Sequence, residues 1–108
     1  MNPVTRMQRI EAMLAEAPAD PELHYMLAME HISQEDDAGA VRCFERLFAV
    51  APNYPPAYHM AGRTLQRLGR VDEARAILQK GIPIALSNKD THAAGEMQEL
   101  MEQLAIDN

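Results

Sequence analysis

Histidine and cysteine have the widest chemical range of the side chains in this sequence, and their spacing limits what they can do. His24 and His31 lie seven residues apart in a segment with a helical pattern of apolar residues, so they share one face. Two helical turns separate their side chains by about 10 Å, too far for one metal ion without further ligands. Cys43 is the only cysteine and precedes Phe44, which favours a buried, unreactive thiol. We therefore predict two packing histidines, no metal site and no catalytic nucleophile.

A search for enzyme motifs also gives no catalytic site. The sequence contains no HExxH, CxxC or GxGxxG pattern, no phosphate-binding loop and no nucleophile elbow. An enzymatic interpretation would rest on His24 and His31 alone, and metal analysis of the purified protein would test it. The prediction is a protein that is not an enzyme and that binds no cofactor.

A second chemical group is cationic. His59, Arg63 and Arg67 follow one another at four-residue spacing, with Gln66 alongside, so on a helix they project from one face. No acidic residue lies three or four positions away on the same predicted helix to neutralise the arginines. Because Arg can hold a carboxylate by two parallel hydrogen bonds, this face predicts an acidic or C-terminal peptide segment as its ligand.

Length and charge limit the kind of protein that presents these residues. The chain has 108 residues, enough for a single domain with a modest core, and we predict one domain over residues 1–108. Its net charge of −6 disfavours nucleic-acid binding, and no apolar run approaches the roughly 20 residues that cross a bilayer. The lone cysteine suits a reducing compartment. We expect a cytoplasmic protein that binds neither nucleic acid nor membrane.

The elements that carry these residues are predicted to be helices arranged in a repeat. Pro21 and Pro55 lie 34 residues apart, each at the start of an amphipathic run, where proline is tolerated in the first helical turn. Those runs predict helices over residues 22–33 and 57–68, each followed by a polar break and a second helix, over 38–51 and 71–86. Asp37 and Asp72 are placed to open the second helices. A period of this length is typical of stacked helical hairpins.

The residues at matching positions resemble the tetratricopeptide repeat, which has a small residue in the first helix, Ala followed four residues later by an aromatic residue in the second, and Pro at the end. The first unit has Leu27, Ala28, Ala40, Phe44 and a closing Pro52, and the second has Tyr58, Ala61, Gly62, Leu68, Gly69, Ala74 and Leu78. The sequence departs from the pattern at Leu86, where a closing Pro is expected, and at Glu35, where the second unit has glycine.

The resemblance implies an all-α fold, a right-handed α-α superhelix with a C-terminal capping helix. We predict a half repeat at residues 4–18, full repeats at 21–54 and 55–88, and a capping helix at 90–105, whose apolar stripe belongs to the core. In the family, the first helix of each unit lines a concave groove that binds a peptide of a partner protein. Carried onto this sequence, the groove residues are Glu22, Tyr25, Met29, Ile32, Ser33, His59, Arg63, Gln66 and Arg67.

Two functions follow from this arrangement. The first is a non-enzymatic protein-interaction module or adaptor that binds a partner peptide in the groove. The second is a structural protein that forms a homodimer or larger oligomer, because the ends of so short a stack are available to pack on a second copy.

Overall fold

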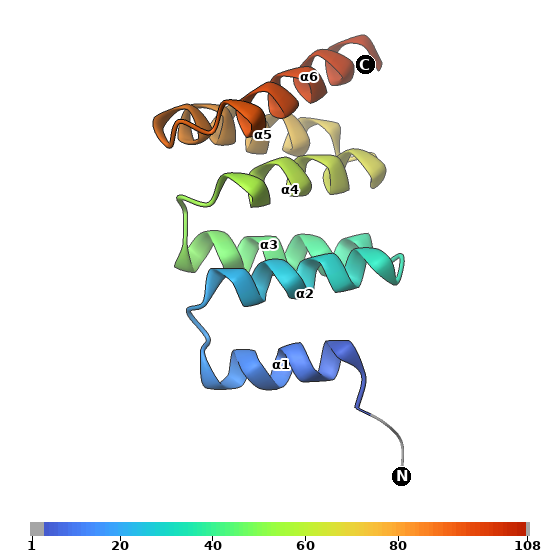
Figure 1. The fold of residues 1–108 in the computed structure, drawn as a ribbon. Helices are drawn as coiled ribbons and strands as arrows, with labels where there is room; N and C mark the ends of the chain where they lie inside the picture. Colours follow the sequence, from blue (N-terminus) through green and yellow to red (C-terminus); the bar gives the residue numbers. More distant parts are fainter. Residues whose placement is uncertain (1–3, 108) are drawn as a thin grey trace. The chain divides into compact units, whose positions relative to one another are not determined.

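The computed structural model describes residues 4–107, and the regular structure in that part of the chain is entirely helical (Figure 1). The helices are α1 (Arg6–Glu16), α2 (Pro21–Ser33), α3 (Asp37–Val50), α4 (Pro55–Arg67), α5 (Val71–Ser87) and α6 (Thr91–Asp107). The predicted all-α class is confirmed, and every predicted helix is present, with its ends shifted by no more than two residues. None of the helices in the described residues is long and apolar enough to cross a membrane.

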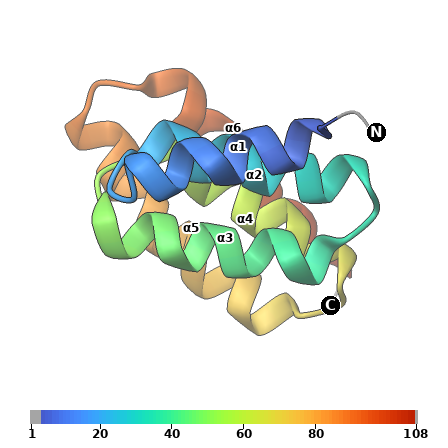
Figure 2. The ribbon, with the colours of Figure 1, turned by 90° about the horizontal axis from the view of Figure 1, so that it is seen from below.

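The helices form two compact units, unit 1 (Met1–Pro52) and unit 2 (Asn53–Asn108). In unit 1, α1 and α3 both pack against α2 (Figure 2). In unit 2, α5 packs against α4 and α6, and α4 and α6 also contact each other. The division falls close to the predicted boundary between the two full repeats, while the predicted limits of the repeats and the single domain over residues 1–108 stay predictions.

Proline lies at the helix starts as the sequence suggests, but neither predicted aspartate is the capping residue: Asp72 lies in the first turn of α5, whose N-cap residue is Arg70. Pro21 and Pro55 are the first residues of α2 and α4. The residue that caps α3 is Asp36, whose carboxylate accepts the Gly39 N–H at 2.9 Å, and not Asp37, which lies in the first helical turn. Asp36 is the better cap because its backbone is outside the helical conformation (φ −108°, ψ 73°), which lets the carboxylate reach an N–H that has no helical partner.

The three hairpin turns, after α2, α4 and α5, share one backbone arrangement. A residue with positive φ reverses the chain, and the N–H of the residue after it donates to a carbonyl in the last helical turn, as in a Schellman motif. The positive-φ residues are Glu35 (59°), Gly69 (75°) and Lys89 (59°). The closing bonds run from Asp36 to His31 (2.8 Å), from Arg70 to Leu65 (2.9 Å) and from Asp90 to Ala85 (2.9 Å). Glu35 therefore adopts the conformation of the glycine that it replaces, so the departure from the repeat pattern preserves the turn.

The predicted packing residues form the core of each unit. Ala28, Ala40 and Phe44 are each no more than 1% exposed in unit 1, and Ala74 and Leu78 are fully buried in unit 2. These small residues let the helices of a hairpin approach closely while the large ones fill the remaining space. The predicted core stripe of the last helix is buried at Ala93, Ala94, Met97, Leu100 and Leu104, with Met101 half-buried.

Gly81, on α5, lies against both other helices of unit 2. A Cβ at this position would lie 2.5 Å from the Tyr58 Cβ on α4 and 2.8 Å from the Met97 sulfur on α6. Such distances are shorter than any normal contact between carbon atoms, so a side chain here would force the helices apart. Gly81 thus sets how near α4 and α6 come to each other across α5.

Candidate functional site

The histidines of unit 1 take part in the connections between helices. His24 is 8% exposed, and its Nε2 donates to the Pro18 carbonyl oxygen at 2.7 Å. His31 Nδ1 donates to the Asp36 carboxylate at 2.9 Å, and the pKa of Asp36 is lowered by the bond from the Gly39 N–H and, second, by this bond from His31. The two histidines thus bind different partners, as expected for packing residues. In residues 4–106, no three His, Cys, Asp or Glu side chains are grouped closely enough to hold a metal ion.

The predicted groove residues of unit 1 lie on α2 and are partly exposed. Tyr25 is half-buried and packs edge-on against Phe44, with ring centroids 6.3 Å apart. Met29 and Ile32 are also half-buried, while Glu22 and Ser33 are exposed. This surface of α2 therefore combines apolar contact area with polar side chains, as the sequence suggested.

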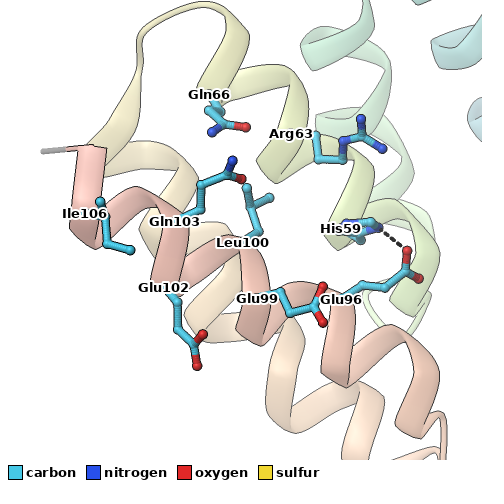
Figure 3. Close-up of a pocket in the computed structure, with 9 residues that line it drawn as sticks. All are labelled: His59, Arg63, Gln66, Glu96, Glu99, Leu100, Glu102, Gln103 and Ile106. Atoms are coloured by element: carbon cyan, nitrogen blue, oxygen red, sulfur yellow. Dashed lines mark ion pairs between the residues drawn. The ribbon is translucent and has the colours of Figure 1, made fainter.

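Unit 2 contains an open cavity of about 650 Å³ between α4 and α6, which we call the α4–α6 groove (Figure 3). The residues from α4 are His59, Arg63 and Gln66, and those from α6 are Glu96, Glu99, Leu100, Glu102, Gln103 and Ile106. Three of the four groove residues predicted in unit 2 thus line one cavity. Arg67 does not line it and instead places its guanidinium 3.4 Å from the Thr64 hydroxyl.

His59 lies at one end of the groove and connects its two walls. Its side chain is 14% exposed, and its Nδ1 is 3.9 Å from the carboxylate of Glu96, which also contacts His92 Nε2 at 3.0 Å. Burial lowers the pKa of His59, and Arg63 and His92 lower it further, while Glu96 acts in the opposite direction. Because its usual pKa is 6.5, His59 is predominantly neutral at pH 7.

The other charged side chains of the groove do not neutralise one another. Arg63 is exposed, and no carboxylate in residues 4–106 lies within 4.0 Å of its guanidinium. Glu99 and Glu102 are exposed on the opposite wall and have no cationic partner in the same part of the chain. The groove therefore offers unpaired charges of both signs on facing helices.

The α6 wall is held in position by contacts to α5. Arg75 Nη2 donates to the Leu104 carbonyl oxygen at 3.2 Å, near the end of α6. Leu100 and Leu104 are 6% and 1% exposed, so the wall stands on packed apolar side chains. Ile106, in contrast, is 83% exposed at the far end of the groove.

The residues that α6 adds to the site were not predicted from the sequence, which assigned this helix to capping and, in the alternative function, to self-association. A signal for them exists. Glu96, Glu99, Gln103 and Ile106 recur at intervals of three or four residues, which defines a second helical face beside the apolar stripe. Only the packing of α6 against α4 shows that this face lines a cavity and not open surface.

Comparisons with known proteins agree with the helical architecture. The sequence matches the tetratricopeptide repeat family over residues 31–104. A tetratricopeptide repeat domain protein from Salinibacter ruber is similar in its crystal structure (29% identity, 80% of this chain and 97% of that chain, TM-score 0.75) and in its solution structure (30% identity, 81% and 88%, TM-score 0.75). A protein from Bordetella parapertussis is similar over 99% of this chain and 91% of its own, with 27% identity and a TM-score of 0.82. No curated protein matches the sequence.

Proposed function

The chain belongs to the tetratricopeptide repeat family, and from this premise we propose that it is a non-enzymatic adaptor that binds a protein partner in the α4–α6 groove. Tetratricopeptide repeat domains generally mediate protein–protein interactions, and the family is typically non-catalytic. The observation that carries the proposal is the open groove of about 650 Å³, in which Arg63, Glu99 and Glu102 have no partner of opposite charge within residues 4–106.

The groove has the properties of a peptide site. Leu100 and Ile106 supply apolar contact, and Gln66 and Gln103 supply hydrogen-bonding amides on facing walls. Arg63 is available for a charge-assisted hydrogen bond, which is stronger than a bond between neutral groups. The remaining predicted groove residues are proposed as further contacts, in each unit separately: Glu22, Tyr25, Met29, Ile32 and Ser33 on α2 of unit 1, and Arg67 on α4 of unit 2.

The predicted charge of the partner rests on α4 alone. His59, Arg63 and Arg67 favour an acidic or C-terminal segment, and that segment remains one candidate ligand. The glutamates of α6 do not enter that prediction, and they face the same cavity. The proposed location of the adaptor is the cytoplasm, which suits the free thiol of Cys43.

Site-specific photo-crosslinking tests the proposed site and captures the partner in the same experiment. A photoreactive amino acid replaces Gln66 or Gln103 in cells of the source organism, and Gln79, which is exposed on α5 outside the groove, serves as the control. We expect both groove positions to capture the same protein and Gln79 to capture none. Capture at Gln79 alone, or of unrelated proteins at the two groove positions, would place the interaction elsewhere.

Self-association is a second candidate because apolar side chains are exposed on the first and last helices. Met13 on α1 is 45% exposed and Ile106 on α6 is 83% exposed. In an oligomer, such residues would pack against a second copy of the chain. Light scattering at two concentrations separates the candidates, since an increase of mass with concentration supports the oligomer and a constant monomer mass contradicts it.

A further inference from the structure

The charges of the α4–α6 groove determine which kind of partner segment it binds. This inference rests on the proposed function. Three glutamates and one arginine line the groove, and His59 is predominantly neutral at pH 7 because burial lowers its pKa. The groove therefore has an excess of two negative charges. The net charge of the whole chain, −6, has the same sign as this excess.

The negative charges that remain available lie on α6. Glu96 is already contacted by His92, whose Nε2 lies 3.0 Å from its carboxylate, and the neutral His59 lies 3.9 Å away. Glu99 and Glu102 lie one helical turn apart, are exposed, and have no cationic partner in residues 4–106. Arg63 stands on the opposite wall without closing an ion pair across the groove to either of them. Two carboxylates are thus free to receive cations from a ligand.

Apolar surface beside these carboxylates makes the groove more than an acidic patch. Leu100 lines the groove but is only 6% exposed, so most of the apolar area comes from Ile106, which is 83% exposed one turn beyond Glu102. A ligand that covers this exposed isoleucine stabilises the complex, because apolar area is removed from water. The matching ligand therefore carries apolar and cationic side chains together.

We propose that the α4–α6 groove binds a basic amphipathic segment of a partner protein. Lysine or arginine side chains of this segment lie against Glu99 and Glu102, and an apolar side chain covers Leu100 and Ile106. The acidic segment predicted from α4 has the opposite charge. A basic segment is preferred because the α6 carboxylates outnumber the one arginine in the groove. An acidic occupant would bring like charges to the α6 wall, which is unfavourable at short range.

Two synthetic helical peptides test the charge preference directly. They share the same apolar residues and differ only in having lysine or glutamate on the polar face. Their affinities are measured at low salt by titration of the isotope-labelled protein, with chemical-shift changes mapped onto the chain. We expect the lysine peptide to bind roughly tenfold more tightly, as two exposed ion pairs predict, and to shift α4 and α6 resonances. Added salt should reduce the difference.

Paired variants separate the groove from the overall charge of the chain. Glu99→Lys with Glu102→Lys should abolish or reverse the preference for lysine. Glu11→Lys with Glu16→Lys makes the same change of net charge on exposed positions of α1, outside the groove, and should leave the preference intact. Circular dichroism spectra of both double variants control for folding.

The sign of one further effect distinguishes the two ligand classes. Arg63→Glu should strengthen binding of the lysine peptide, whereas an acidic occupant requires Arg63 and would lose affinity by more than roughly tenfold. Three results would overturn the proposal of a basic segment: tighter binding of the glutamate peptide, binding of neither peptide, or equal effects of the two double variants. The photo-crosslinks at Gln66 and Gln103 test the proposed site independently, so a captured acidic partner would leave the adaptor function standing.

Discussion

Replacing Gly81 by alanine tests how closely the helices of unit 2 meet. The added methyl group would lie 2.5 Å from the Tyr58 Cβ and 2.8 Å from the Met97 sulfur. The Met97 side chain is flexible and can withdraw, but the Tyr58 Cβ is fixed to the backbone of α4, and the Tyr58 side chain is fully buried. The helices themselves must therefore move.

The magnitude follows from comparison with Gly95, which lies inside α6 and has no atom within 4 Å of an added Cβ. Alanine in place of glycine favours a helix interior by about 0.8–1 kcal/mol, so Gly95→Ala should stabilise the protein by that amount. Gly81→Ala gains the same propensity but suffers overpacking, which costs about 1–3 kcal/mol. Because the propensity cancels, the free energies of unfolding of the two variants should differ by about 1–3 kcal/mol.

Urea denaturation followed by circular dichroism measures this difference. We expect the midpoint to rise for Gly95→Ala and to remain unchanged or fall for Gly81→Ala, with similar slopes, so that the midpoints report stability. An equal rise for both variants would refute the close approach of α4, α5 and α6. If the approach is as described, Gly81→Ala should also alter peptide binding, because it separates the two walls of the α4–α6 groove.

Three other predictions concern the turns, the core and pH. Glu35→Gly should raise the free energy of unfolding by about 0.5–1 kcal/mol, since glycine adopts positive φ more readily, while Glu35→Ala should give no gain in the same urea assay; Lys89→Gly should act likewise. Ala40→Leu and Ala74→Leu should each cost about 1–3 kcal/mol by overpacking a hairpin, and an unchanged denaturation midpoint in both would contradict the repeat register. Because the folded protein lowers the pKa of His59 below 6.5, the unfolded chain binds more protons as the pH falls, so the stabilising term present above pH 6.5 is lost at lower pH. Melting temperatures from about pH 8 to about pH 5 should therefore fall less for His59→Gln than for the wild type, and parallel curves would show that His59 does not contribute.

The sequence predicted the helices well because their signals are local. Proline at the first helical turn, at Pro21 and Pro55, and the spacing of apolar residues each depend on a few neighbouring positions. The small residues Ala40 and Ala74 were predicted to be buried from their register in the repeat, and both are fully buried. Features that follow from the 34-residue repeat could therefore be predicted from the sequence.

The groove was predicted only in part because it depends on contacts between distant segments. His59, Arg63 and Gln66 were identified as one face of a helix, which periodicity can show. The opposite wall needs α6 to pack against α4, and no local pattern states which face of α6, with Glu99 on it, turns toward Arg63. The difference between Asp36 and Asp37 as the cap of α3 has a similar cause, because it depends on the backbone of the preceding turn.

The buried thiol of Cys43 gives the protein an internal reporter of its own opening. The thiol is 1% exposed, so a thiol-specific reagent has little access to it, and burial raises its pKa, which lowers the fraction of reactive thiolate. Labelling then requires α3 to separate from its neighbours in unit 1, and its rate at low denaturant measures the free energy of that event. Since the chain has no other cysteine, the signal comes from one place without any engineering. Comparing the labelling rate of the wild type with that of Gly81→Ala, which lies in unit 2, would measure whether the two units open together or one at a time.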